Sequence, residues 1–105
     1  MFRQGDVLVI PIDGQVPKDA APEKAEAGRV ILAHGEATGH AHAVLERDAT
    51  IHARTTGMTV ERWLSARKPT ALVHEEHAPF PVPKGNSLVI RQREYSPEAI
   101  RNVAD

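Results

Sequence analysis

The sequence predicts an all-β protein, a small antiparallel roll or barrel that ends in a short C-terminal helix. Three observations predict this fold: the apolar segments are short and rich in β-branched residues, glycines and prolines separate them at close spacing, and only the C-terminal end carries helix signals. At 105 residues and 11.5 kDa, the chain has the length of one domain. We therefore expect residues 1–105 to form a single domain.

Seven segments carry the strand pattern. The first, 7–12, has the β-branched content of a strand buried on both faces, and Pro11 indicates that the strand has an open edge there or ends early, since proline cannot donate to a β-ladder. Segment 58–64 is short and contains Thr, Val and Trp, which favours a strand over a helix. The expected strands are residues 7–12, 29–34, 40–46, 50–54, 58–64, 70–74 and 87–94.

The remaining stretches are expected to be a loop, an extended segment and a helix. Residues 13–28 hold two prolines and many small or charged residues, which is typical of an exposed loop. Three prolines in 79–83 force an extended path. Ser96 as the cap and Pro97 at the first helical position predict a helix over residues 96–103.

Composition excludes several classes of protein and of site. The chain has no cysteine, which excludes disulfides, thiolate metal ligands and cysteine nucleophiles. A formal net charge of −1 and four aromatic residues argue against binding of nucleic acid, which needs a basic face or a stacking platform. The longest apolar run of about six residues is too short to cross a membrane, and the amino end lacks the pattern of a signal peptide. We expect a cytoplasmic protein that binds neither membranes nor nucleic acid.

The strongest chemical signal is the pattern His40-x-His42 with Glu46. Side chains alternate across a strand, so a strand over 40–46 would place both imidazoles and the carboxylate on one face. Two histidines and a carboxylate suffice for one face of an Fe, Mn or Ni site, and with a third histidine they can also hold Zn. The alternative is that these residues form the polar, exposed face of a half-buried strand.

A second histidine pair, His74 and His77, encloses two glutamates. In a regular strand these two side chains would point to opposite faces, so they can converge only if the strand bends or ends near Glu76. His74 is the stronger candidate for a metal ligand, with His77 and Glu76 behind it. A solvated acidic strand end is the equally good alternative. For the isolated histidines, His34 and His52, structural or exposed roles are favoured.

Part of this pattern resembles a known metal-binding motif. Gly35, His40-x-His42 and Glu46 resemble the first motif of the cupin superfamily, in which a glycine precedes His-x-His and a glutamate follows. The resemblance implies a cupin-like barrel with a metal held by these histidines and the glutamate.

The second cupin motif matches less of the sequence. Pro83-x-Gly85 resembles its start, but Leu88 stands where that motif has a histidine. Under this resemblance His74 or His77 supplies the remaining ligand.

A longer resemblance covers nearly the whole chain. The segments FRQGDVL (2–8), GEATGHAH (35–42), HEEHAP (74–79) and RQREYSP (91–97) resemble a small family of uncharacterised proteins from bacteria and their phages. This resemblance implies no activity.

The sequence leads to two hypotheses of function. The first is a β-protein that binds a divalent metal, Fe, Mn, Ni or Zn, through His40, His42, Glu46 and His74 or His77, with an open coordination position for water or a small-molecule ligand. The second is a metal-free interaction module with a protein partner, either monomeric or a homo-oligomer, in which the histidines form a pH-sensitive surface. Whether the protein is an enzyme is left open by the sequence.

Overall fold

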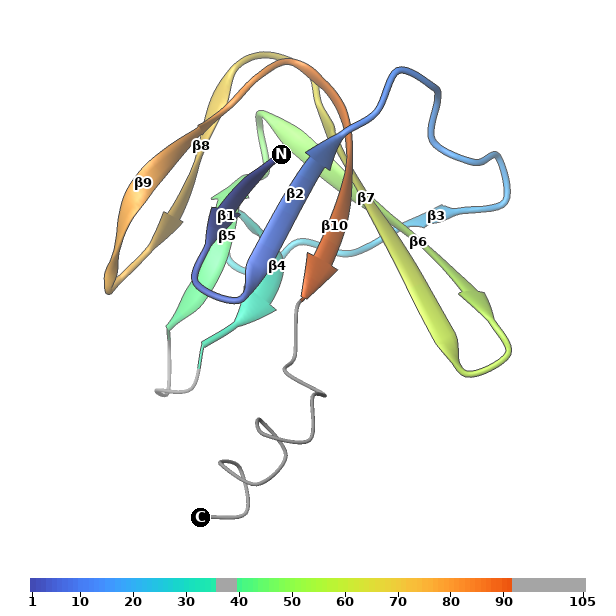
Figure 1. Cartoon of the computed structure of the whole chain (residues 1–105), viewed down its shortest axis with the longest axis horizontal. Coiled ribbons are helices and arrows are strands. Elements are labelled where there is room, and N and C mark those ends of the chain that lie inside the picture. Colours follow the sequence, from blue (N-terminus) through green and yellow to red (C-terminus); the bar gives the residue numbers. More distant parts are fainter. Residues whose placement is uncertain (36–39, 92–105) are drawn as a thin grey trace.

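A computed structural model describes residues 1–35 and 40–91, which form ten antiparallel strands (Figure 1). The strands are β1 (Phe2–Gln4), β2 (Val7–Pro11), β3 (Ala21–Pro22), β4 (Arg29–His34), β5 (Ala41–Leu45), β6 (Ala49–Thr56), β7 (Thr59–Ala66), β8 (Thr70–His74), β9 (His77–Val82) and β10 (Gly85–Arg91). The prediction of an all-β antiparallel fold is confirmed.

The strands form two sheets around one core. The six-stranded sheet has the order β1-β2-β10-β7-β6-β3, and the four-stranded sheet has the order β4-β5-β8-β9. The buried apolar cluster takes residues from both sheets, such as Val9 and Leu64 from the first, and Leu32 and Leu72 from the second. The inward faces of the two sheets therefore bury each other, which explains the alternation of buried and exposed positions along β2 and β10.

Most of the expected strands are present. β4 and β8 have the predicted bounds. β6 and β7 each end two residues later than predicted, and they pair over eight positions. β2 ends at Pro11, and the pairing of β1 with β2 stops earlier, at Phe2 opposite Val9. The proline therefore sits where the β1 side of the strand is open, as its missing N–H requires.

Three strands escaped the prediction: β1, β3 and β9, the last of which was expected only as an extended segment over 79–83. β1 is only three residues long, and β3 is a two-residue strand in the middle of the expected loop, where Pro22 pairs with His52. Both are too short to show a period of two in the sequence. The helix predicted over residues 96–103 and the last residues of the strand predicted over 87–94 lie outside the described residues.

Two irregularities in the four-stranded sheet determine where the histidines lie. The register of β4 against β5 shifts between Ile31 and Ala33, so that His42 lies opposite Ala33. A second shift, between Leu72 and His74, precedes the tight turn that joins β8 to β9 and leaves His74 opposite His77. Bulges of this kind bend a strand and redirect its side chains.

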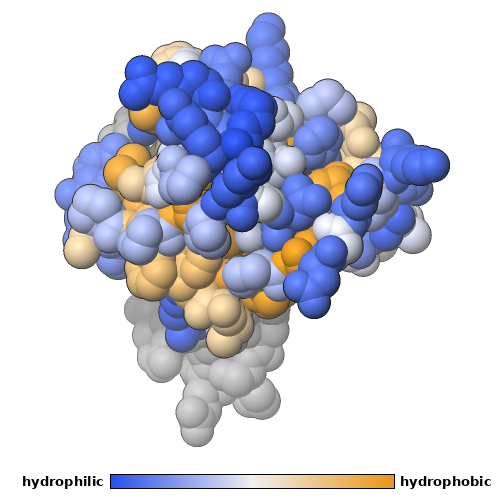
Figure 2. Space-filling model, turned by 90° about the horizontal axis from the view of Figure 1, so that it is seen from above, coloured by the Kyte–Doolittle hydropathy of each residue, from blue (hydrophilic) through white to orange (hydrophobic). Residues whose placement is uncertain are grey.

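The surface alternates between polar and apolar residues. In the view from above, hydrophilic residues cover most of the face and hydrophobic ones are visible between them (Figure 2). The most exposed large apolar side chains are Met58 and Val60, at the tip of the β6–β7 hairpin, and the N-terminal Met1. Within the described residues, no helix is long and apolar enough to span a membrane.

Candidate metal centre

Four histidines from three neighbouring segments meet at one end of the four-stranded sheet. His42 lies in β5 and is 3% exposed, His74 ends β8, His77 begins β9, and His40 precedes β5. The ring centroids of His42 and His74 are 4.2 Å apart, and those of His74 and His77 are 4.8 Å apart. The ring of His40 meets that of His74 edge-on at 5.8 Å. The predicted convergence of the two histidine pairs is therefore present in the fold.

The turn between β8 and β9 explains how His74 and His77 come together. The strand ends at His74, two glutamates form the turn, and His77 starts the return strand directly opposite. Two residues directly opposite each other in an antiparallel pair have side chains on the same face. The alternation that would separate the two residues in a continuous strand thus no longer applies.

Two sets of side chains have the spacing of metal ligands. The ligand atoms of His42, His74 and His77 all lie within 4.8 Å of one another, and the same holds for His40, His74 and Glu75. His74 belongs to both sets and lies at the centre of the cluster. The first set consists of imidazoles alone, whereas the second adds a carboxylate.

A buried glutamine orients the ring of His42. Gln4, in β1, is 3% exposed, and its Oε1 lies 2.9 Å from Nδ1 of His42. Its amide nitrogen donates to the carbonyl oxygens of Leu72 and Ala78, each at 2.9 Å. The ring of Phe2 stacks on that of Phe80 in β9, with centroids 4.8 Å apart, and this contact keeps β1 against β9.

Two glycines face the imidazoles at close range. A Cβ atom at Gly5 would lie 3.0 Å from Nε2 of His77 and 3.3 Å from Nε2 of His42, so both nitrogens border the same small region. Gly5 also has a φ of 59°, which other residues rarely adopt. A Cβ at Gly35 would lie 2.9 Å from Nε2 of His74. Larger residues at these two positions would fill the space in front of the histidine nitrogens.

The turn glutamates hold the outer histidines. The backbone N–H of Glu76 donates to Nδ1 of His74 at 3.0 Å, and a Glu76 carboxylate oxygen lies 3.5 Å from Nδ1 of His40. Glu75 accepts a hydrogen bond from the N–H of Ala41, and this bond is the main reason that the pKa of the Glu75 carboxyl is lowered. Glu75 is thus a carboxylate at neutral pH.

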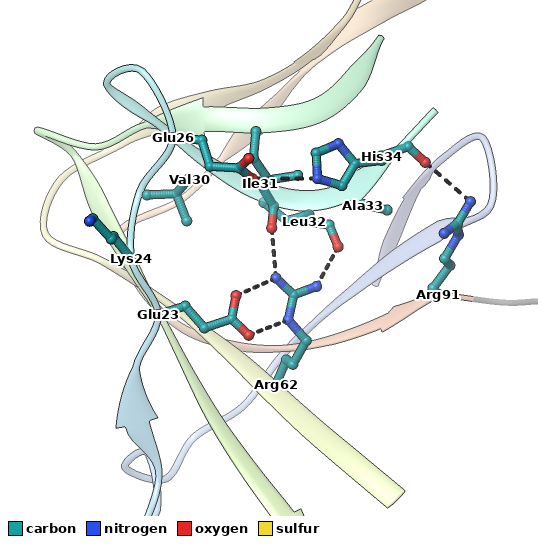
Figure 3. Close-up of a pocket in the computed structure, with 10 residues that line it drawn as sticks. All are labelled: Glu23, Lys24, Glu26, Val30, Ile31, Leu32, Ala33, His34, Arg62 and Arg91. Carbon is teal, nitrogen blue, oxygen red and sulfur yellow. Dashed lines mark hydrogen bonds and ion pairs between the residues drawn. The ribbon is translucent and has the colours of Figure 1, made fainter. Parts of the chain in front are cut away.

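Asp6 and Arg91 form the side of the site that faces the six-stranded sheet. Asp6 Oδ1 lies 3.5 Å from Nε2 of His42, while its Oδ2 accepts a hydrogen bond from Nε of Arg91 at 2.8 Å. Arg91 also donates to the carbonyl oxygen of His34 (Figure 3). Partial burial raises the pKa of Asp6, but the hydrogen bond and charge of Arg91 outweigh it and the net shift is downward.

The pKa of His42 is shifted in the direction that metal binding requires. Burial is the main cause that lowers this pKa below its usual value of 6.5, and the neighbouring charge of His74 lowers it further. The nearby Asp6 carboxylate opposes the shift without reversing it. His42 is therefore neutral at neutral pH, the form in which imidazole binds a metal.

The histidines line a cavity of about 370 Å³ that opens to solvent. The cavity is lined by Gly5, Asp6, His34, Gly35, His40, His42, His74, Glu76, His77 and Arg91. Its wall therefore carries imidazoles, two carboxylates and one guanidinium. This volume leaves room beside the nitrogens for water or a small molecule.

Not every residue expected at the site is there. Glu46 is exposed and belongs to neither set of ligand atoms. β5 ends at Leu45, and Glu46 starts the following turn, where its N–H donates to the carbonyl of Gly28. The alternation argument assumed a strand that continued to Glu46, and about 13 Å of strand separates this residue from His42. The structure thus does not bring Glu46 to the histidines.

The isolated histidines have other surroundings. His34 is exposed, lies at the rim of the cavity and has Nε2 at 3.4 Å from Glu26. His52 is half-buried in β6 opposite Trp63, away from the cavity. Neither belongs to a set of candidate ligands.

A second cavity, of about 290 Å³, lies beside β4 (Figure 3). Arg62 of β7 crosses it, donates to both carboxylate oxygens of Glu23 and also donates to the carbonyl oxygens of Ile31 and Leu32. These bonds occupy most of the guanidinium donors. Arg62 therefore ties the six-stranded sheet to the irregular part of β4 and leaves little of its charge for a ligand.

Comparison with known protein families assigns the chain to one of them. A family model described as a domain of unknown function, DUF8820, matches residues 3–92. The chain belongs to the DUF8820 family. No curated protein and no solved structure matches the chain. The match begins within β1 and includes all of β10, so all the residues of the histidine cluster lie within the family domain. The expectation of an uncharacterised family is met, while the cupin resemblance stays a prediction.

The residues that sequence reasoning missed are those that support the histidines. Gln4 ends β1, and Gly5 and Asp6 form the turn to β2. These three residues carry no ligand pattern of their own. A glutamine becomes conspicuous only when burial is known, because a buried amide has to find partners. Gly5 and Asp6 stand directly before the first expected strand, and nothing in the sequence placed them against His42.

Proposed function

We propose that this protein binds a divalent transition-metal ion through the imidazoles of His42, His74 and His77. The observation that carries the proposal is the mutual spacing of their ligand atoms, all within 4.8 Å, at the wall of an open cavity. Three histidines with an open side are a common protein ligand set for zinc and related ions.

The chemistry of the ligands narrows the choice of metal. Imidazole suits Zn, Ni and Fe, whereas Mg and Ca prefer oxygen ligands, and the chain has no thiolate to offer. Among Fe, Mn, Ni and Zn, a set made of imidazoles favours Zn or Ni over Mn, whose complexes with nitrogen ligands are weaker. The carboxylates of Asp6 and Glu76 on the cavity wall offset part of the charge of the ion.

Three protein ligands leave room for a further ligand in the cavity. A metal ion at this position supplies Lewis acidity or lowers the pKa of a bound water, the two properties that metal-dependent hydrolysis and related reactions use. Asp6, held by Arg91, lies next to Nε2 of His42 and is placed to accept a proton from such a ligand. The proposal extends to metal binding and an accessible coordination position, and a reaction would have to be found by assay.

Titration of the metal-free protein with metal ions tests this proposal most directly. The protein is purified without a histidine tag, dialysed against a chelator, and titrated with ZnCl₂ and NiCl₂ by calorimetry, with MgCl₂ as the control. We expect about one Zn or Ni ion per chain and a rise in melting temperature with added metal, because a ligand that binds only the folded state stabilises it. If the protein takes up no metal and its melting temperature stays constant, the metal-free interaction module becomes the better hypothesis.

A further inference from the structure

The buried amide of Gln4 is held in one orientation. Its nitrogen faces the carbonyl oxygens of Leu72 in β8 and Ala78 in β9, both at 2.9 Å. A backbone carbonyl only accepts hydrogen bonds, so the group that faces both of them has to be the NH₂ and not the oxygen. A flipped amide would place its oxygen against two carbonyl oxygens and leave a buried donor without a partner.

This orientation fixes the proton of His42. With the NH₂ group directed at the two carbonyls, the atom that faces Nδ1 of His42 at 2.9 Å is the amide oxygen. An amide oxygen cannot donate, so Nδ1 has to carry the proton and donate to it. In the neutral ring, Nε2 then has the free lone pair, and Nε2 is the nitrogen that faces Gly5 and the cavity.

We propose that Gln4 is a positioning residue that selects the Nδ1–H tautomer of His42 and so makes Nε2 its metal-binding nitrogen. The inference rests on the proposed function for its metal-binding part, while the tautomer itself is a property of the metal-free protein. Hydrogen bonds from the second nitrogen of a metal-binding histidine to a carbonyl or carboxylate generally set the orientation of the ring.

The hydrogen-bond partners at position 4 explain why an amide, and not a carboxylate, stands there. Gln4 has to satisfy two carbonyls and one N–H at a position that is only 3% exposed. A carboxylate could accept from His42, but it would also point a charge at the oxygens of Leu72 and Ala78. Glutamine alone among the similarly sized side chains offers both the donors and the acceptor. It also links β1 of one sheet to β8 and β9 of the other.

NMR chemical shifts of the ring nitrogens test the tautomer without any metal. Long-range ¹H–¹⁵N spectra of the chelator-treated protein at about pH 8, where neutral imidazole dominates, distinguish a protonated from an unprotonated ring nitrogen. We expect His42 to show a protonated Nδ1 and an unprotonated Nε2. The opposite pattern in the wild-type protein would overturn the inference, whether or not the protein binds metal.

Two variants test the effect on metal binding. Gln4→Leu removes the acceptor, and we expect zinc affinity to fall about 10- to 100-fold, the usual effect of losing such a partner. Gln4→Glu keeps an acceptor for Nδ1–H, so it should retain the tautomer and most of the affinity even though its folded state is less stable. If Gln4→Leu does not fold, the tautomer of the wild-type protein and the affinity of Gln4→Glu still decide the question.

Asn86→Leu is the matched control. The amide of Asn86 also donates to a backbone carbonyl, that of Gly14, but lies away from the histidines. We expect this variant to lose stability without a change in zinc affinity. Equal affinities for wild-type and Gln4→Leu proteins would show that Gln4 has a structural role only. Absence of zinc binding by the wild-type protein would instead overturn the proposed function and leave the tautomer to the NMR measurement.

Discussion

At the scale of single residues, the two central histidines of the site differ in their hydrogen-bond partners. His42 is buried, neutral and oriented by Gln4. His74 differs, because its Nδ1 accepts the N–H of Glu76 and its own proton is therefore on Nε2. The two central rings of the cluster thus carry their protons on different nitrogens. Because the two rings differ in this way, the contribution of each to the proposed metal binding can be tested separately.

Loss of His42 should have the largest effect on metal binding. We expect His42→Ala to lower zinc affinity at least about tenfold, since it removes a preoriented ligand and leaves the carbonyl partners of Gln4 in place. Glu46→Gln and His52→Ala should leave the affinity unchanged, because neither side chain belongs to the cluster. Calorimetric titration of the three variants provides the measurement. A strong effect of Glu46→Gln alone would favour the ligand set expected from the sequence pattern.

The lowered pKa of His42 predicts a pH dependence of stability. Because the pKa in the folded state lies below 6.5, the unfolded chain binds more protons between these two values. The free energy of unfolding should therefore rise with pH through this window and fall as the solution is acidified below about pH 6.5. Thermal melts of chelator-treated protein across this range measure the slope, which His42→Gln should reduce. Identical slopes for the two proteins would contradict the assignment.

A second stability loss is expected in stronger acid. The pKa of the Asp6 carboxyl is lowered from 3.8 because Arg91 outweighs the effect of burial. For an acid the sign is such that the stabilisation is present above the unfolded-state value and disappears as the pH falls through the folded-state value. Asp6→Asn should remove this part of the acid sensitivity. It should also widen the His42 window below pH 6.5, because the Asp6 carboxylate opposes the lowering of the His42 pKa. The same series of melts, extended to about pH 3, separates the two groups.

At the scale of secondary structure elements, the β8–β9 turn is the part of the site that the proposed binding of a metal by His74 would change. If the metal takes Nδ1 of His74, it replaces the N–H of Glu76. If it takes Nε2, the ring proton moves to Nδ1, which can then no longer accept. Both routes break the same hydrogen bond, so the two-glutamate turn has to shift.

The backbone amide of Glu76 reports this change. On addition of zinc we expect its NMR signal to move and its hydrogen exchange to become faster, while the N–H of Ala41, bonded to Glu75, stays protected. His74→Ala serves as the control in which the amide of Glu76 no longer responds to zinc. An unchanged Glu76 amide in zinc-bound wild-type protein would show that His74 is not a ligand.

The same turn shows how far the sequence could predict the site. The strand over 70–74 was visible from its β-branched residues, and the convergence of His74 with His77 could be stated as a condition, namely that the strand ends near Glu76. For Glu46 the sequence contained no sign that β5 stops one residue earlier, so the alternation rule was extended too far. Local patterns determined the elements, whereas strand ends depended on pairing between segments far apart in the chain.

At the scale of the whole molecule, the site requires both sheets. The histidines belong to the four-stranded sheet or its connections, while Gln4, Gly5 and Asp6 come from the first turn of the six-stranded sheet. The relative position of the sheets therefore decides whether Gln4 reaches His42. Burial of apolar residues between the sheets supplies most of this attachment, but it is not directional.

Arg62 adds directional attachment between the sheets to that supplied by Gln4 and Arg91. Its guanidinium, on β7, donates to carbonyl oxygens of Ile31 and Leu32 on β4, where the register with β5 shifts, and Glu23 holds it in place (Figure 3). Because the register shift leaves His42 opposite Ala33, a contact that stabilises the shift also stabilises the position of the site.

Replacing Arg62 should therefore weaken both the fold and the site. Arg62→Met keeps the aliphatic stem but leaves two carbonyls without this donor. We expect the free energy of unfolding, measured in urea, to fall by about 1–3 kcal/mol. The loss should lie toward the lower end of this range because the Arg62 side chain is 23% exposed. Glu23→Gln keeps one acceptor for Arg62 and should cost less. Zinc affinity should also fall in Arg62→Met, although Arg62 lies outside both candidate ligand sets. If Arg62→Met unfolds at a lower urea concentration but binds zinc as tightly as the wild-type protein, the β4 register does not position His42, and β5, β8 and β9 alone hold the histidines in place.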